Sequence, residues 1–518
     1  MWRVKPLDAI LATAEKKSLH RSLGVVQLTL LGVGAIIGTG IFVLTAEAAQ
    51  KAGPGMMISF IIAGAVCAVA ALCYSELASM VPVSGSAYTY SYAVLGEVFA
   101  WLVGWALILE YAVAASAVSV GWSGYFVGLI EHSLNVTIPP EFANGPYAGG
   151  IVNLPAVVIG LLVTLLLIRG TRESATVNAV LVAIKVAALS AFIWLALPLI
   201  KDQNFQPFAP LGTAGVIGAA ASIFFAYVGF DAVSTAAEET KNPQRNVPIA
   251  LIGSLVICTV FYLLVAAGAI GAYGAQPVFG AGGEVLAPGS MALTQQCATL
   301  TQAGQQPLVC SKEALAHVLR QIGQPQVGNL LGLAAFLALP SVILAMIYGQ
   351  TRIFFVMSRD GLLPSVLSRV HPKFKTPHIV TMLTGAGVML AAAFLPVGKL
   401  ADISNSGTLF AFLMVSLAVM ILRKTNPDRK RPFRTPLVWI VAPLSVLGCA
   451  VLFFFLPHDA KLLFPIWSGV GLVVYLLYGV HKSHVGRGII EVPELDPNAP
   501  PTSAGAQPMP GVENPPGS

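Results

Sequence analysis

Residues 31–44 read LGVGAIIGTGIFVL, an apolar stretch of helical length that glycine interrupts at Gly38 and Gly40. A second apolar stretch, SIFFAYVGFDAVS at 222–234, is interrupted at Gly229. We expect both interruptions to lie near the middle of a bilayer. A helix is broken at that depth only where protein or a polar cavity satisfies the backbone groups that the break exposes. Paired broken helices are typical of secondary transporters, which bind their substrates at the midplane.

The composition predicts an all-α polytopic membrane protein. Of the 518 residues 56% are hydrophobic and only 10% are charged, and the mean hydropathy is +0.79. A soluble surface cannot cover so apolar a chain. At about 20 residues per spanning helix, we expect twelve spans, at 23–47, 55–79, 98–130, 151–168, 174–200, 212–237, 247–273, 327–356, 378–397, 403–422, 437–457 and 463–481.

Basic residues predict the orientation, because Lys and Arg are retained in short cytoplasmic loops. With the N-terminus inside, the cytoplasmic segments hold 22 of the 29 Lys and Arg residues and the outer segments hold 6. Both termini are therefore expected to be cytoplasmic. The predicted parts are an N-terminal segment (1–22), a ten-helix core (23–422), a basic cytoplasmic loop (423–436), helices 11 and 12 (437–482) and a tail (483–518).

Segments outside the spans carry weaker signals. No cleavable signal peptide is evident, so the first helix is expected to stay as an anchor. The tail is rich in Pro, Gly, Ser and Ala, and we expect it to be disordered. Cys297 and Cys310 both fall in the long outer segment 275–326, where a disulfide is possible in an oxidising compartment. The basic loop is a candidate contact for anionic lipid, and nothing in it indicates nucleic-acid binding.

Two interpretations of the glycines at the breaks are open. Glycine relieves the steric cost of leaving helical dihedrals and leaves no side chain between backbone and ligand. The N–H groups at the start of the second half-helix would then bind a substrate carboxylate, and carbonyls at the second break would accept from a substrate ammonium. Alternatively, the glycines only allow helices to pack closely. Their occurrence in two corresponding helices favours the substrate site, and the opposite partial charges indicate a zwitterion.

Three ionisable residues fall deep inside predicted spans: Glu110, Lys185 and Asp231. Each is expected to have a function or a partner. Lys185 is a candidate proton carrier, because a lysine in a low-dielectric place is readily deprotonated. The alternatives are a static ion pair with Asp231 or Glu110, or a bond to carbonyls of the broken first helix. Phe225 beside the second break is a candidate gate, although aromatic residues in spans usually only pack.

Five segments, in order and similarly spaced, resemble the cationic amino acid transporter branch of the amino acid, polyamine and organocation superfamily. They are GVGAIIGTGIF (32–42), YSELASMVPVSGSAYTYSY (74–92), LEYAVAASAVSVGWSGYF (109–126), FFAYVGFDAVSTAAEETKNPQRNVP (224–248) and TRIFFVMSRDGLLP (351–364).

The resemblance covers about residues 20 to 480, and the chain resembles bacterial members of the branch. It implies the five-plus-five inverted-repeat fold of the leucine transporter, with broken helices 1 and 6 and two extra helices, in a bacterial inner (plasma) membrane. It also implies that Lys185 stands where sodium-coupled relatives hold a sodium ion, so Na⁺ coupling is unexpected and H⁺ is the expected coupling ion. Asp231 and Glu110 match acidic residues of the family. The implied substrate site comprises Ile37, Gly38, Thr39, Gly40, Ile41, Phe225, Ala226, Val228 and Leu339.

The substrate stays open between two kinds of amino acid. The stretch AAFLALPSVILAM (334–346) offers Leu339 towards the expected side-chain pocket, where an unpartnered guanidinium would be costly to desolvate. Small neutral L-amino acids such as alanine are therefore favoured over arginine or lysine. A sensor or a membrane subunit without net transport is the alternative from another class. No nucleophile, metal or cofactor constellation appears, so no enzyme is expected; the lipid bilayer is a partner, and a small single-helix accessory subunit is an open question.

Overall fold

The computed structural model describes residues 3–6, 10, 23–81, 86–170, 175–237, 240–374 and 376–488. Most of the predicted N-terminal segment and residues 489–518 of the predicted disordered tail lie outside these ranges. Within them the chain is helical apart from turns, short connections and two isolated β-bridges. The architecture is therefore all-α, as the composition predicts.

Apolar helices make up the bundle. Eight helical stretches are long and apolar enough to cross a membrane: Leu44–Met80, Glu97–Leu134, Thr176–Leu199, Pro243–Tyr273, Pro325–Arg359, Val397–Thr425, Val438–Phe455 and His458–Arg487. Four shorter apolar helices accompany them: Val25–Ile36, Leu154–Arg169, Gly212–Tyr227 and His378–Phe394. Each of the twelve predicted spans overlaps one or more of these stretches.

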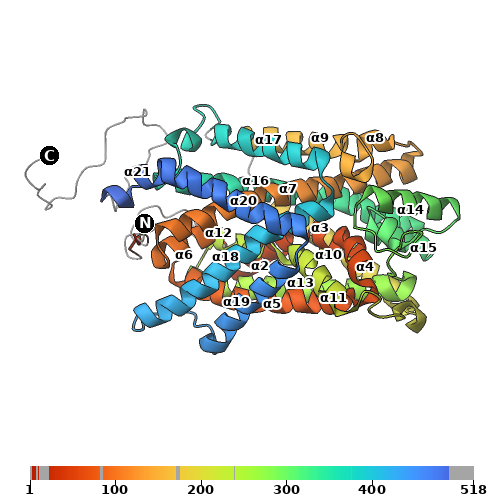
Figure 1. Cartoon of the computed structure of the whole chain (residues 1–518), viewed down its shortest axis with the longest axis horizontal. Coiled ribbons are helices and arrows are strands. Elements are labelled where there is room, and N and C mark those ends of the chain that lie inside the picture. The colour runs from red at the N-terminus through yellow and green to blue at the C-terminus, as the bar shows by residue number, and fades with distance from the viewer. Residues whose placement is uncertain are drawn as a thin grey trace, which may run out of the picture.

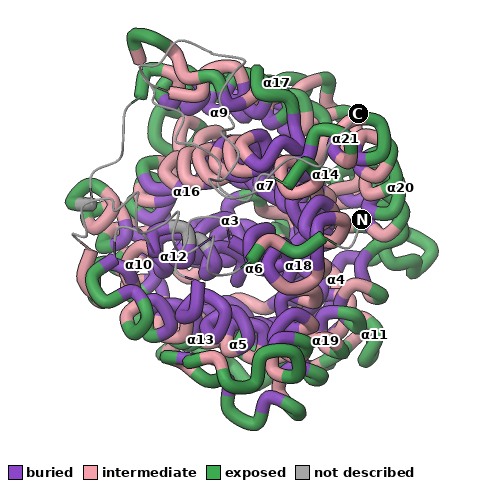
Figure 2. The backbone as a smooth tube through the Cα atoms, turned by 90° about the vertical axis from the view of Figure 1, so that its left-hand side faces the viewer, coloured by how far each residue is buried: buried purple, intermediate pink, exposed green. Residues whose placement is uncertain are grey.

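The helices lie roughly along the long axis of the molecule (Figure 1). Helices α9 (Leu154–Ile168) and α17 (His378–Phe394) pack together on one side, and α5 (Met56–Met80) packs against α13 (Pro243–Tyr273) and α19 (Val438–Phe455) on another. Between them, α7 (Glu97–Leu134) packs against both α16 (Pro325–Arg359) and α18 (Val397–Thr425). The remaining long helices are α10 (Ala175–Ala196) and α20 (His458–Val474). Figure 2 shows the interior of this bundle as buried and its outer helices as alternately buried and exposed.

The first apolar run is broken at Ile37 and Gly38. Helix α2 (Val25–Ile36) ends at an extended residue, Ile37, and α3 (Thr39–Phe42) follows Gly38, whose φ of −143° and ψ of −148° are far from helical values. A second irregular residue, Val43, separates α3 from α4 (Leu44–Ala52). The predicted interruption is therefore present, but Gly40 lies inside α3 rather than at the break.

The second run is broken at Val228 and Gly229. Helix α11 (Gly212–Ile223) tightens into a 3₁₀ turn, η5 (Phe224–Tyr227), and α12 (Ala232–Thr235) begins after a short non-helical segment. Gly229 has a φ of +115°, which residues with a side chain rarely adopt, so glycine is required at this position. Figure 2 shows α3 near the middle of the bundle, with α12 close by.

Two ends of the bundle can be distinguished. At one end, the segment 275–326 folds into α14 (Met291–Gln302) and α15 (Ala314–Gln321), beside α8 (Pro140–Ala143) (Figure 1). At the other end lie α6 (Ser86–Val94) and α21 (Val480–Lys482). We call these the α14–α15 end and the α6–α21 end. A disulfide joins Cys297 to Cys310 at the α14–α15 end.

The first and last parts of the described chain meet at the α6–α21 end. Lys5 Nζ lies 2.9 Å from Asp360 Oδ1, and the His484 N–H donates to the carbonyl oxygen of the same Asp360 over 3.0 Å. Nearby, the buried Glu76 carboxylate on α5 accepts from Arg423 and Arg431 of the basic loop. The structure thus shows a defined ion-pair network at Glu76, to which the sequence analysis assigned no role.

The segment after Arg359 forms a single helical turn. The apolar spacing of 362–370 suggests one more surface helix, but only a 3₁₀ turn, Ser365–Ser368, forms. Gly361 takes a φ of +79° and so ends α16, and Pro364 removes an N–H donor that a new helix would need. Leu362 and Leu363 are buried, whereas Val366 is exposed.

Candidate substrate site at the two helix breaks

The two breaks touch each other in the bundle interior. A Cβ added at Gly40 would lie 2.3 Å from Cα of Ala226, so the backbone of α3 lies directly against η5. At the second break, a Cβ added at Gly229 would lie 2.8 Å from the carbonyl oxygen of Ala35 in α2. Gly40 therefore serves close packing, and Gly229 serves close packing as well as the second break. The interpretation of the glycines as packing positions holds for both, and their role in substrate binding stays a prediction.

Thr39 supplies a polar group without a partner at the first break. Its side chain is 0% exposed, and its Oγ1 has no hydrogen-bond partner among the described residues. Gly121 on α7 makes room for it, since a Cβ there would lie 2.2 Å from Thr39 Cγ2. Buried hydroxyl groups are nearly always hydrogen-bonded in folded proteins. An orphan hydroxyl beside the first N–H groups of α3 is therefore suited to a polar ligand.

Tyr262 of α13 links the two breaks, and the sequence analysis missed it. Its hydroxyl lies 2.9 Å from the carbonyl oxygen of Ile36 and 2.8 Å from that of Ala226. These carbonyls belong to the last turn of α2 and to η5, where helical hydrogen bonding stops. A single tyrosine within a long apolar helix gives no sequence signal for this role, because its partners are far away along the chain.

The expected acceptors for a substrate ammonium are partly engaged within the fold. The carbonyl of Phe225 accepts from the Val228 N–H over 3.2 Å, and the carbonyl of Ala226 has Tyr262 as its partner. The third expected acceptor is the carbonyl of Val228, which lies in the extended segment after η5. Phe225 is 7% exposed, more than any other residue of η5, and its role as a gate stays a prediction.

Helix α16 borders the first break from the side. A Cβ at Gly38 would lie 3.6 Å from Val342 Cγ1, which is ordinary contact. Leu339 is fully buried one turn before Val342 on the same helix. The structure thus brings the apolar face of α16 to the break, with Ile37 and Ile41 buried on the α2 and α3 side.

Lys185 binds the first broken helix. Its ammonium donates to the carbonyl oxygen of Gly34 over 2.9 Å, and its side chain is 1% exposed. The lack of a side chain at Gly34 permits this approach, because a Cβ there would lie 2.6 Å from Val182 Cγ2 of α10. Of the alternatives for Lys185, the bond to a carbonyl of the broken first helix is present in this structure.

Glu110 and Asp231 are both buried near the second break. The hydroxyl of Tyr111, next to Glu110 on α7, donates to Asp231 Oδ2 over 3.2 Å. Glu110 Oε2 has no hydrogen-bond partner within the described part of the chain, and the residue packs beside Gly407 of α18. Ionisable residues buried at such depth are typical of proton pathways.

A third polar cluster, also missed from the sequence, ties the broken helices together towards the α14–α15 end. Lys51 at the end of α4 lies 3.1 Å from Asp402 Oδ2 of α18. Ser222 at the end of α11 hydrogen-bonds to both Lys51 and Asp402. The cluster therefore joins one half of each broken helix to α18.

Two broken apolar helices that meet around an unpartnered hydroxyl, inside a bundle of membrane-length helices, define an integral membrane transporter rather than an enzyme. The comparison with known families agrees: the amino acid permease family model matches residues 23–477, and the chain belongs to this family, within the superfamily that the five segments indicate.

Curated relatives match over nearly the whole chain. The methylthioribose transporter of Bacillus subtilis (strain 168) is 43% identical, over 94% of this chain and 99% of the relative. The branched-chain amino acid permease BcaP of the same organism is 45% identical, over 93% and 97%. Cationic amino acid transporter 9, chloroplastic, of Arabidopsis thaliana is 36% identical, over 88% and 77%.

Proposed function

We propose that the protein is a secondary active transporter that moves neutral L-amino acids across the membrane by alternating access, coupled to protons. The buried, unpartnered Thr39 hydroxyl at the contact between the two breaks carries this proposal, because it marks a polar site in an apolar interior. Apolar residues of α16 at the break favour a neutral side chain. Alanine represents the small neutral substrates, and the name of the BcaP relative extends the proposal to branched-chain amino acids.

The proposed fold has twelve spans, with helices 1 to 5 repeated in inverted topology by helices 6 to 10 and two helices added. The eight long and four shorter apolar stretches support it, and the breaks fall in the first and sixth of the predicted spans. Both termini are proposed to be cytoplasmic in a plasma membrane. The positive-inside bias supports this orientation. The contact of Lys5 and His484 with the same residue, Asp360, also supports a common side for both ends of the described chain.

In the proposed binding pose, the substrate carboxylate lies at the N–H groups of Thr39, Gly40 and Ile41. These groups start a half-helix and carry partial positive charge. The ammonium faces the carbonyls after η5, with Val228 as the main acceptor. The side chain points to the apolar face of α16 at Leu339.

The proposed coupling uses the ammonium of Lys185. In its charged form it makes a charge-assisted hydrogen bond to the Gly34 carbonyl, and loss of the proton weakens that bond. Release of α2 would then let the first helix rearrange between transport states. Asp231 and Glu110 would pass the proton, and Na⁺ is not expected to substitute.

The test is uptake into proteoliposomes of labelled alanine, leucine and arginine, first under an inward pH gradient and then under a sodium gradient. Uptake of alanine or leucine that follows the pH gradient, and that fails in Lys185→Ala, supports the proposal. Sodium-driven uptake, or pH-driven uptake undiminished in the variant, excludes coupling through Lys185. Preferred uptake of arginine overturns the neutral substrate.

Methylthioribose belongs in the same panel as an unlabelled competitor, because a relative with 43% identity carries that name. Competition by methylthioribose stronger than by any amino acid would replace the amino acid with a thiosugar as the substrate.

A variant that matches Lys185→Ala without touching the break is Lys201→Ala, since Lys201 is exposed in the connection after α10. It is expected to transport as the wild type does.

A further inference from the structure

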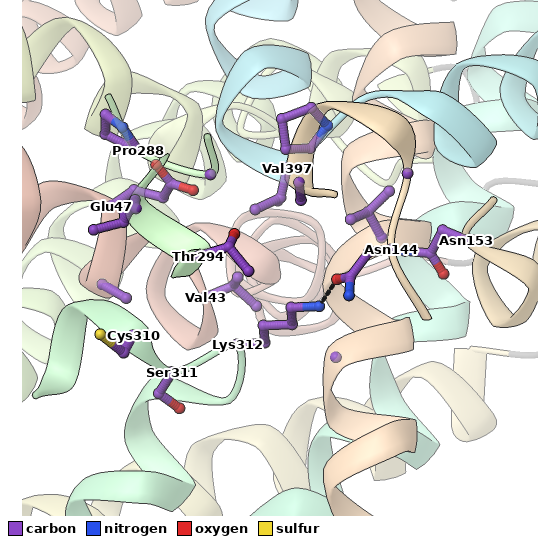
Figure 3. A pocket seen from close by; sticks show the side chains of 18 of the residues that line it. Val43, Glu47, Asn144, Asn153, Pro288, Thr294, Cys310, Ser311, Lys312 and Val397 are labelled. Carbon is purple, nitrogen blue, oxygen red and sulfur yellow. Dashed lines mark hydrogen bonds between the residues drawn. The ribbon is translucent and has the colours of Figure 1, made fainter. Parts of the chain in front are cut away.

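A small pocket lies at the α14–α15 end, separate from the break. Its volume is about 170 Å³, and its walls come from α4, α7, α8, α14, α17 and the segments around 288 and 311 (Figure 3). Pockets for drug-sized ligands measure about 300–1,000 Å³. This pocket therefore suits a ligand no larger than an amino acid.

Most polar groups in the pocket wall are used by the fold. Gln50 binds the backbone of Val278 and Leu286 with both ends of its amide. Asn153 accepts from Ser123 and from the Ala156 N–H with its carbonyl oxygen. These groups hold the wall in place. They leave the charged groups of the pocket to a ligand.

Glu47 is the acidic group of the pocket. Its Oε2 is buried and has no hydrogen-bond partner among the described residues. The neighbouring cation Lys51, one turn on in α4, is engaged with Asp402 and Ser222. One carboxylate oxygen is thus left for a hydrogen-bond donor, and a buried carboxylate without one is costly.

Lys312 is the basic group of the pocket. Its side chain is exposed, and its ammonium reaches Asn144 across the wall, which leaves other donors of the ammonium for a ligand (Figure 3). The disulfide of Cys310, two residues earlier, fixes the segment that carries it.

We propose that this pocket is a loading site, in which a zwitterionic amino acid places its ammonium at Glu47 and its carboxylate at Lys312 before it moves to the helix breaks. The inference rests on the proposed function for its ligand class. Val43, Leu293 and Phe394 offer apolar surface for a neutral side chain. Val43 also follows α3 directly, so the loading site and the break share one stretch of backbone.

Equilibrium binding of labelled leucine to the purified full chain tests the proposal without any need for transport. Wild type is expected to have two classes of leucine-binding site that differ in affinity. It should therefore bind about two molecules of leucine per chain at saturation. Glu47→Gln and Lys312→Gln should each remove the weaker class and keep the other. Glu131→Gln and Lys201→Gln change exposed residues outside the pocket and should keep both classes. Unchanged thermal unfolding midpoints show that the variants are folded.

Uptake kinetics give a second readout. Each pocket variant should raise the KM for external leucine about tenfold, which corresponds to about 1.4 kcal/mol, with the maximal rate kept. A merely structural defect would lower the maximal rate instead. If the pocket variants have the same KM as the two control variants, the loading site is overturned. A single class of leucine-binding site in wild type would overturn it as well.

The outcomes separate this inference from the proposed function. If wild type transports leucine and the pocket variants keep two binding classes, only the loading site fails. If no amino acid is transported while Glu47→Gln still abolishes a class of leucine binding, only the transport proposal fails. An absence of leucine and alanine binding to wild type overturns both.

Discussion

Gly40 shows how a residue expected to free backbone for a ligand can instead fit two helices together. Because its missing side chain lets α3 lie against η5, it sets the distance between the half-helices that form the candidate site. The two roles depend on each other, since N–H groups of one break and carbonyls of the other can hold one zwitterion only if the breaks are close.

Gly40→Ala is expected to abolish uptake. The new Cβ would lie 2.3 Å from Ala226 Cα, and overpacking of this kind costs about 1–3 kcal/mol and moves the backbone. Gly218→Ala in α11 is the matched control, because a Cβ there meets nothing within 4 Å. Uptake of labelled leucine and the thermal unfolding midpoint are measured for both. Normal uptake by Gly40→Ala would show that the close contact is not needed.

Tyr262→Phe is expected to reduce uptake and to lower the thermal unfolding midpoint. The change removes one hydroxyl, whose single proton is shared between the carbonyls of Ile36 and Ala226, at a cost of about 1–3 kcal/mol. Tyr478→Phe in the last helix is the control, since Tyr478 lies away from the breaks. If both variants behave alike, the hydroxyl does not hold the breaks together.

Sequence patterns locate the breaks but not the groups that stabilise them. Glycine inside an apolar run is a local signal, and it correctly places both interruptions within about two residues. The Tyr262 hydroxyl, by contrast, acts on Ile36, 226 positions away, and Lys51 acts on Asp402, 351 positions away. No periodicity or spacing in one sequence encodes such pairs. In the sequence, Asp402 and Lys51 cannot be told apart from other charged residues near the ends of spans.

Half-helices are the elements that alternating access must move, and polar groups hold them at defined points. Towards the α14–α15 end, Lys51, Asp402 and Ser222 join α4, α11 and α18. On the other side of the break, Lys185 joins α10 to α2. Both halves of the first broken helix, and one half of the second, are therefore tied by an ion pair or hydrogen bond that can open without unfolding the bundle. Opening at one cluster need not open the other.

Lys51→Met is expected to open the α14–α15 end. Loss of the ammonium leaves the buried Asp402 carboxylate uncompensated, a change that costs about 3–5 kcal/mol in buried pairs and favours a state in which water reaches it. Labelling of Val43→Cys by a membrane-impermeant maleimide reports the opening, because Val43 lines the pocket there. Labelling of Val43→Cys should be several-fold higher when it is combined with Lys51→Met than when it is combined with Lys201→Met. Equal labelling would show that the cluster does not close this end.

At the scale of the whole molecule, the positive-inside bias and the fold make one joint prediction. Tags inserted at the N-terminus and after residue 488 should both be protected from protease in right-side-out membranes, and a tag between residues 280 and 283 should be cleaved. The reason is that 22 basic residues fall in segments on the predicted cytoplasmic side and that Lys5 and His484 meet at Asp360. Cleavage at one terminus alone would contradict the twelve-span topology.

The shared contact at Asp360 has a consequence for how the chain could be rewired. Residues 5 and 484 bind the same aspartate, so a short peptide could join the two ends of the described chain without crossing the bundle. Neighbouring termini are what permits circular permutation. A permuted chain that begins within the connection between α10 and α11 would start with the second broken helix and finish with the first. The order in which the two broken helices are made would thereby be reversed, while the contacts between them would stay the same.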